Sequence, residues 1–214
     1  MKIHRGWNTH LGDWIASINR ACFLGEKAGH PVKLSTLNYG HDMRSKATEI
    51  CSLLDSKWLP EFVHQEATED VNGYHVWAAP VVPTLPMYRW SVSKMMASNP
   101  MICYQFDGVS AAAHTNPTEA EGEAFLNVWG QDVEKIRLGN HMTLAECAEV
   151  MSRCEAGVFV DSGMSHLAHA VGCPTFIYER QLAIITTHRG KAYCKFHNAF
   201  DLAEHAQYWK EMCR

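Results

Sequence analysis

The chain has 214 residues, of which 47% are hydrophobic, and its 19 Lys and Arg against 23 Asp and Glu give a formal net charge of -4. This is an ordinary globular composition, long enough for one large domain or two small ones. The slight acidity argues against a basic coat for nonspecific binding of nucleic acid, although it does not exclude a local basic groove.

The eight cysteines are scattered along the chain and include no CxxC pair. The spacing therefore predicts neither a disulfide framework nor a zinc site. The N-terminal segment MKIHRGWNTHLGDW lacks the apolar core of a signal peptide. No stretch approaches the roughly 20 apolar residues that cross a bilayer. We expect a soluble protein of a reducing compartment, the cytoplasm, with no membrane span.

The first half alternates short strand-like runs with helical ones. In chain order, the predicted elements are a strand at 2–5, a loop at 6–12, a helix at 13–28, a strand at 31–37, a helix at 44–54, and short strands at 63–66 and 74–78. The first helix is predicted because Trp14, Ile15 and Ile18 recur at helical spacing, and Gly29 stops it. Asn99-Pro100 marks the predicted hinge between the halves.

The second half shows the same alternation more clearly. Strands are predicted at 101–106, 133–138, 157–160, 175–178 and 192–196, and helices at 118–129, 143–154, 164–171 and 201–212. Strands that alternate with helices form βαβ units and a mostly parallel sheet. The sequence therefore predicts an α/β protein of two small Rossmann-like lobes, residues 1–98 and 99–214.

The segment VFVDSGMSHLAHAVGCPTFIYE, residues 158–179, carries the clearest chemical signal. A hydrophobic strand ends at Asp161, Ser162-Gly163 forms a tight turn, and a helix begins with Met164, Ser165 and His166. Ligands of open α/β sheets bind beyond the carboxyl ends of the strands. A helix N-terminus at that place offers unpaired N–H groups to a diphosphate, and a glycine lets the backbone come close to it.

Structural explanations of the same residues remain open. Capping of the helix alone would explain Asp161 or Ser162, and His166 can be a satisfied, half-buried histidine. His166 and His169, three residues apart and with no third ligand, are weak evidence for a metal.

The run DSGMSHLAHAVGCP resembles the donor-binding signature of the heptosyltransferases, family 9 of the GT-B glycosyltransferases. The preceding LGNHMTLAECAEVMSRCEAGVFV is similar to that family's approach to the motif, and HLGDWIASINRACFLGEKAGHPVKL resembles its N-terminal Gly-Asp segment. Together these matches cover about half of the chain.

The resemblance implies a compact GT-B enzyme, with an acceptor-binding lobe at 1–98 and a nucleotide-sugar-binding lobe at 99–214. Asp13 would be the general base, although an N-cap or first-turn acid favoured by the helix dipole explains it equally well. The expected donor-binding residues are Asp161, Ser162, Gly163, Met164, Ser165 and His166. Further acceptor or phosphate contacts are expected from His10, Gly12, Ser110 and Arg180. No metal or cofactor is expected.

The chain departs from that family in its length and in one loop. It is much shorter than a usual two-lobed member, and no Lys or Arg lies between Met101 and Glu134, where the family often has a basic residue against the donor phosphates. The acceptor is expected to be either a bacterial saccharide or a hydroxymethylated base of phage DNA, with the host cytoplasm as the location if the protein is viral. The alternatives are a noncatalytic nucleotide-binding module or, less favoured because no GxSxG motif is present, a hydrolase that uses His166 with Ser162 or Ser165.

Overall fold

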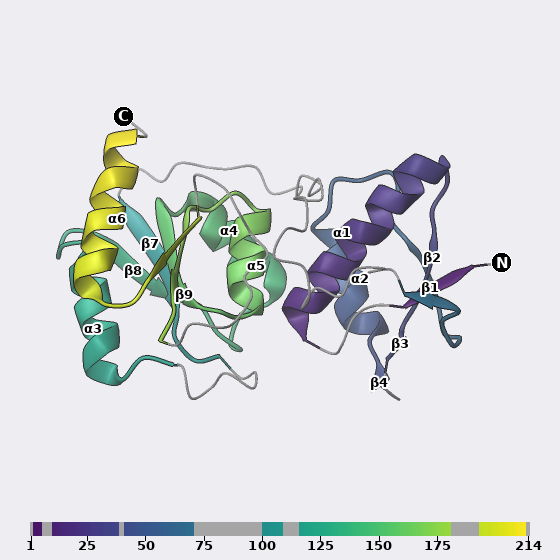
Figure 1. The fold of residues 1–214 in the computed structure, drawn as a ribbon, viewed down its shortest axis with the longest axis horizontal. Coiled ribbons are helices and arrows are strands. Elements are labelled where there is room, and N and C mark those ends of the chain that lie inside the picture. The colour runs from purple at the N-terminus through teal and green to yellow at the C-terminus, as the bar shows by residue number, and fades with distance from the viewer. Residues whose placement is uncertain are drawn as a thin grey trace. The chain divides into compact units, whose positions relative to one another are not determined.

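The computed structural model describes residues 2–5, 10–38, 41–70, 100–108, 116–180 and 193–212. The chain divides into two compact units, Met1–Val92 and Ser93–Arg214, and each contains its own parallel sheet (Figure 1). The predicted lobe boundary at residues 98 and 99 and the predicted strand at 74–78 lie outside the described residues.

The N-terminal unit has a four-stranded parallel sheet of strand order β5-β2-β1-β6 and a separate antiparallel pair, β3 with β4. Its elements are β1 (Ile3–Arg5), α1 (Leu11–Ala28), β2 (Lys33–Ser35), β3 (Leu37–Asn38), β4 (His41–Asp42), α2 (Arg44–Ser52), β5 (Glu61–Val63) and β6 (Glu69–Asp70).

Helix α1 forms because its apolar residues lie on one face and its end is capped. Trp14, Ile15 and Ile18 are buried on that face. Gly29 adopts the left-handed conformation, with φ of 74°, which a glycine reaches without strain and which ends the helix. The helix begins at Leu11, two residues before the predicted start, so Leu11 and Gly12 belong to its first turn and not to the predicted loop.

Two other predictions for this unit need correction. The predicted strand at 31–37 is divided into β2 and β3, with Thr36 between them. The predicted strand at 63–66 is shifted, since β5 spans Glu61–Val63. The short strands β4 and β6 were not predicted, because two-residue strands carry no alternation that could be detected.

The C-terminal unit has a five-stranded sheet of order β11-β10-β9-β7-β8, in which every pair is parallel. Its elements are β7 (Met101–Gln105), α3 (Glu119–Asn127), β8 (Glu134–Arg137), α4 (Leu144–Arg153), β9 (Ala156–Val160), α5 (Gly163–Ala170), β10 (Thr175–Tyr178), β11 (Tyr193–Phe196) and α6 (Ala199–Met212). These elements match the predicted ones to within a few residues.

Helices cover both faces of this sheet, with α3 and α6 on one side and α4 and α5 on the other (Figure 1). The core on the α3 and α6 side is aromatic: the ring of Phe125 lies 5.0 Å from the rings of both Tyr178 and Phe196. Thr118 and Thr143 begin α3 and α4 with capping boxes that use Glu121 and Glu146.

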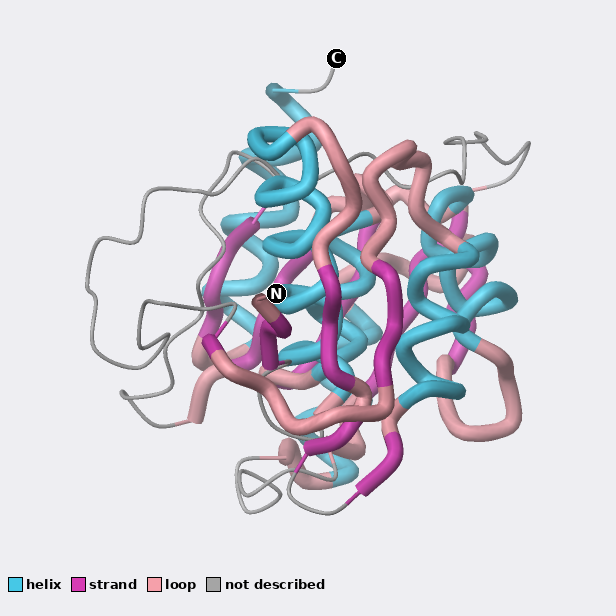
Figure 2. The backbone as a smooth tube through the Cα atoms, turned by 90° about the vertical axis from the view of Figure 1, so that its right-hand side faces the viewer, coloured by secondary structure: helices cyan, strands magenta, loops and turns pink. Residues whose placement is uncertain are grey.

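Helices and strands alternate along most of the chain, and Figure 2 shows them as cyan and magenta segments of the tube. The predicted fold class, an α/β protein with two mostly parallel sheets, is therefore confirmed. Among the described residues, no helix is both long enough and apolar enough to span a membrane.

Candidate functional site

The N-terminus of α5 lies at the carboxyl edge of the C-terminal sheet. All five residues of β9 are buried, and Asp161 and Ser162 follow directly. Ser162 is the N-cap residue of α5, in keeping with the structural explanation of this position. The first backbone bond of the helix runs from the N–H of Ser165 to the carbonyl of Ser162 at 3.1 Å. The N–H groups of Gly163 and Met164 precede that bond and can point toward a ligand.

The strand order makes this edge a topological switch point. The chain leaves β7 for β8 on one side and returns to β9 on the other, so the loops after β7 and β9 diverge there. Open α/β sheets bind ligands in the crevice that opens at such a point. The predicted donor-binding residues at 161–166 follow β9 and therefore lie at this edge of the sheet.

The loop after β7 packs against the turn after β9. The hydroxyl of Ser162 donates to Oε1 of Gln105, at the end of β7, over 3.0 Å. The N–H of Gly108 donates to Oδ1 of Asn116 at 3.2 Å. A Cβ added to Gly108 would lie 3.1 Å from Cγ2 of Val160, so only glycine fits this position without a shift. The sequence analysis missed Gln105, Gly108 and Asn116, because the contacts that bring them to the site depend on strand order.

Burial dominates the electrostatics of the turn. It raises the pKa of Asp161 to about 6, with a smaller lowering effect from Lys195 and a raising effect from Glu179. Burial, together with the neighbouring His169, lowers the pKa of His166 to about 4. His166 is therefore neutral at pH 7 and can offer a hydrogen bond but no positive charge.

The hydroxyl groups of Ser162 and Ser165 do not make the hydrogen bond that a hydrolase nucleophile requires. The hydroxyl of Ser165 donates to the carbonyl of Ser162 at 2.7 Å, and that of Ser162 donates to Gln105. A serine nucleophile needs a hydrogen bond to its base. Neither hydroxyl donates to His166, so the geometry disfavours the hydrolase alternative.

Arg180 lies one residue beyond Glu179 and is already engaged. Its guanidinium forms an ion pair with Glu121, and its Nε donates to the hydroxyl of Tyr178 at 3.1 Å. Because Glu121 also caps α3, the arginine is held on the side of the sheet that α3 covers. Ser110, the other phosphate contact expected in this unit, lies outside the described residues.

Asp13 lies in the N-terminal unit, in the first turn of the helix that follows β1. His10 is the N-cap residue of α1, and its carbonyl accepts the N–H of Trp14 at 3.2 Å. Asp13 is therefore not the cap. Burial raises the pKa of its carboxyl group to about 6, against a lowering effect of His10. Gly12 is buried inside the helix, whereas His10 is exposed.

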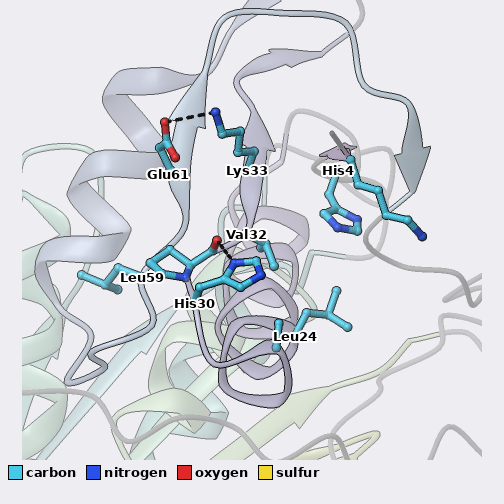
Figure 3. Close-up of a pocket in the computed structure, with 10 residues that line it drawn as sticks. His4, Leu24, His30, Val32, Lys33, Leu59 and Glu61 are labelled. Atoms are coloured by element: carbon cyan, nitrogen blue, oxygen red, sulfur yellow. Dashed lines mark hydrogen bonds and ion pairs between the residues drawn. The ribbon is translucent and has the colours of Figure 1, made fainter.

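A pocket of about 1020 Å³ lies in the N-terminal unit, at the opposite edge of its sheet (Figure 3). Lys33 and Glu61, the first residues of β2 and β5, form an ion pair at 3.6 Å on its wall, and His30 also lines it. Asp13 follows the carboxyl end of β1. The pocket therefore does not contain the predicted base.

Among the described residues, no group of three or more His, Cys, Asp or Glu side chains is arranged to hold a metal ion. The seven cysteines within the described part of the chain are free thiols.

Residues 112–178 match the family model of glycosyltransferase family 9 (heptosyltransferase). The predicted resemblance to that family is thus confirmed over about a third of the chain, including residues 161–166. The N-terminal segment around Asp13 lies outside the match. A comparison with curated proteins gives no significant match.

Three solved structures from Escherichia coli share the fold. The iron-containing dodecameric glycosyltransferase TibC, from the enterotoxigenic strain H10407, is 12% identical and aligns with a TM-score of 0.56 over 82% of this chain and 57% of its own. TibC in complex with ADP-D-β-D-heptose is also 12% identical and aligns over the same shares with a TM-score of 0.52. The ADP-heptose LPS heptosyltransferase II is 11% identical, with a TM-score of 0.54 over 99% of both chains. The chain thus spans little more than half the length of TibC.

Proposed function

We propose that this chain moves a sugar from a nucleotide-sugar donor to an acceptor hydroxyl. The chain is heptosyltransferase-like, and its residues 112–178 match the family 9 model. One observation carries the proposal: the matched segment includes the turn at 161–166, which lies at the switch point of a parallel sheet. Family match and ligand-binding geometry coincide there.

The donor's pyrophosphate would bind at the N-terminus of α5. The N–H groups of Gly163 and Met164 and the positive end of the helix suit a diphosphate. Neutral His166 would add a hydrogen bond. These groups stabilise the charge that develops on the leaving nucleoside diphosphate.

Asp13 would act as the general base. Its carboxylate takes the proton of the acceptor hydroxyl while that oxygen attacks the anomeric carbon. The bond from this carbon to the diphosphate oxygen breaks, and the nucleoside diphosphate leaves with the electron pair. A carboxyl group with a pKa of about 6 is ionised at pH 7 and is a stronger base than an ordinary aspartate.

The acceptor would be a bacterial saccharide or a hydroxymethylated base of phage DNA, and the reaction would take place in the cytoplasm. The complex of TibC with ADP-D-β-D-heptose makes ADP-sugars the first donors to try. Because these donors are substrates, neither a metal nor a cofactor is part of the proposal.

A thermal-shift screen with ADP-, UDP-, GDP- and CDP-sugars tests donor binding, since a ligand that binds only the folded state raises the melting temperature. The absence of a shift with all four classes would refute the proposal.

A noncatalytic nucleotide-binding module would bind a donor but would neither transfer its sugar nor hydrolyse it slowly in water. The engagement of Arg180 by Glu121 leaves this cation unavailable to phosphates in either case, so it does not distinguish the two functions.

A further inference from the structure

Among the described residues, the proposed donor site has more negative than positive charge near its mouth. A nucleoside diphosphate would bring further negative charge close to Asp161 and Glu179. His166 is neutral at pH 7, and Arg180 is paired with Glu121. The described residues after β7 include no Lys or Arg before α3. Strong binding of a diphosphate therefore needs a cation from another part of the fold.

The register of the last three strands brings such a cation to the site. Val160, Tyr178 and Phe196 are paired across β9, β10 and β11, and so are Phe159, Ile177 and Lys195. Side chains alternate along a strand. The first set packs into the aromatic core, so Lys195 extends on the other face, which α4 and α5 cover.

Lys195 reaches the carboxyl edge through Glu179. Its Nζ lies 2.7 Å from Oε1 of Glu179, the residue that follows β10. The side chain of Glu179 is only 13% exposed, whereas that of Lys195 is 35% exposed. The side chain of Glu179 is thus largely enclosed, whereas that of Lys195 remains partly accessible to a ligand.

Asp161 experiences the charges of both partners. Lys195 lowers the pKa of its carboxyl group and Glu179 raises it, in keeping with the pairing of β9 and β10, after which Asp161 and Glu179 follow. Asp161 directly precedes the turn that begins α5, so the pair lies within electrostatic reach of the proposed pyrophosphate.

We propose that Lys195 is the cation that neutralises the donor's pyrophosphate at the N-terminus of α5, and that Glu179 holds this lysine in position when no donor is bound. The assignment rests on the proposed function. A lysine suits the role because its ammonium is a compact charge on a flexible stem, which can be shared between a carboxylate and a phosphate.

The proposal predicts that substitutions of Lys195 and of Glu179 have opposite effects on nucleotide binding. Lys195→Met removes the cation and should weaken binding of the tightest of ADP, UDP, GDP and CDP by about tenfold or more, as expected for the loss of one contact to a charged group. Lys195→Arg should keep most of the affinity. Glu179→Gln releases the lysine from its counter-ion and should tighten binding. A purely structural ion pair would not produce effects of opposite sign.

Lys135→Met is the matched control. Lys135 lies on β8, the other edge strand of the same sheet, and its Nζ donates to the carbonyls of Gly130 and Val133 at 2.6 and 3.1 Å. The substitution Lys135→Met therefore removes an equal charge from the edge strand opposite β11, away from the proposed site. Calorimetry at two salt concentrations should show a weaker salt dependence for Lys195→Met alone.

The outcomes separate the two proposals. If the wild-type chain binds none of the four diphosphates, the proposed function fails, and the role of Lys195 fails with it. If the wild type binds but Lys195→Met binds within about twofold of it, the role of Lys195 is refuted and the donor site stands. Melting temperatures without nucleotide show whether each variant folds, and Lys195→Gln replaces Lys195→Met if that variant does not.

Discussion

The hydroxyl of Ser162 donates a hydrogen bond of 3.0 Å to Oε1 of Gln105, 57 residues earlier in the sequence. This bond joins the end of β7 to the turn that begins α5. Gln105 is buried, and its Nε2 donates to the carbonyl of Asp107 at 3.3 Å. The two loops of the switch point are thus held together by one side-chain amide.

Replacement of Ser162 by alanine should lower the free energy of unfolding by about 1 to 3 kcal/mol, because it leaves a buried acceptor of Gln105 without its donor. Urea denaturation measures the change. The double variant Ser162→Ala with Gln105→Leu should lose less than the sum of the single losses, since the two groups act as one interaction. Additive losses would show that the bond contributes nothing of its own.

The Asp13→Asn variant should abolish sugar transfer and leave donor binding intact. In the wild type, kcat/KM should rise with pH through about 6, as the carboxylate forms. Transfer rates and calorimetry on the same preparations measure the two effects. Normal turnover by the variant would eliminate Asp13 as the base.

Folding stability gives a second measurement on Asp13. Its folded-state pKa lies above the unfolded value, so the folded state binds the proton more tightly, and this carboxyl group destabilises the fold as the pH rises through 4 to 6. Asp13→Asn should remove that effect, and its melting temperature should therefore exceed that of the wild type by more at pH 8 than at pH 4.

The sequence predicted the C-terminal elements well because their patterns are local. β9 is a continuous apolar run bounded by Asp161, and Thr118 and Thr143 start their helices with the capping residues that such starts require. The N-terminal strands were harder to predict because they are only two or three residues long. The helix start at Leu11 was missed because its N-cap, His10, makes no side-chain cap bond.

The residues that contact the candidate site residues could not be predicted from local sequence patterns. The sequence shows that Lys195 and Glu179 are separated by 15 residues, but only the parallel register of β10 and β11 brings their charged atoms together. The engagement of Arg180 by Glu121 likewise depends on which helix covers which face. Motif residues are visible in a sequence, whereas the neighbours that set their charge depend on topology.

His166 should make stability depend on pH in the direction opposite to Asp13. Its folded-state pKa lies near 4, below the unfolded value, so stability is lost as the pH falls from 6.5 toward 4. Replacement by Gln should reduce the loss between pH 7.5 and 5 by about 1 to 2 kcal/mol. Urea denaturation of both proteins at the two pH values tests this, and equal losses would mean that His166 does not titrate as a buried group.

Replacement of Gly108 by alanine should disturb the switch point without removing a polar group. The added Cβ would lie 3.1 Å from Cγ2 of Val160 and 3.4 Å from Oδ1 of Asn116, and the first distance is shorter than nine in ten real Cβ contacts. We expect a loss of about 1 to 3 kcal/mol in the free energy of unfolding, typical of overpacking, and weaker nucleotide binding.

Val160→Ala provides the control for this clash, because it removes the nearest methyl group. Although that substitution destabilises the core by itself, the double variant should be more stable than the sum of the two single losses predicts. Strictly additive losses would show that the loop after β7 does not rest on Val160. The packing of Gly108 would then not explain how this loop is held against the turn at 161–166.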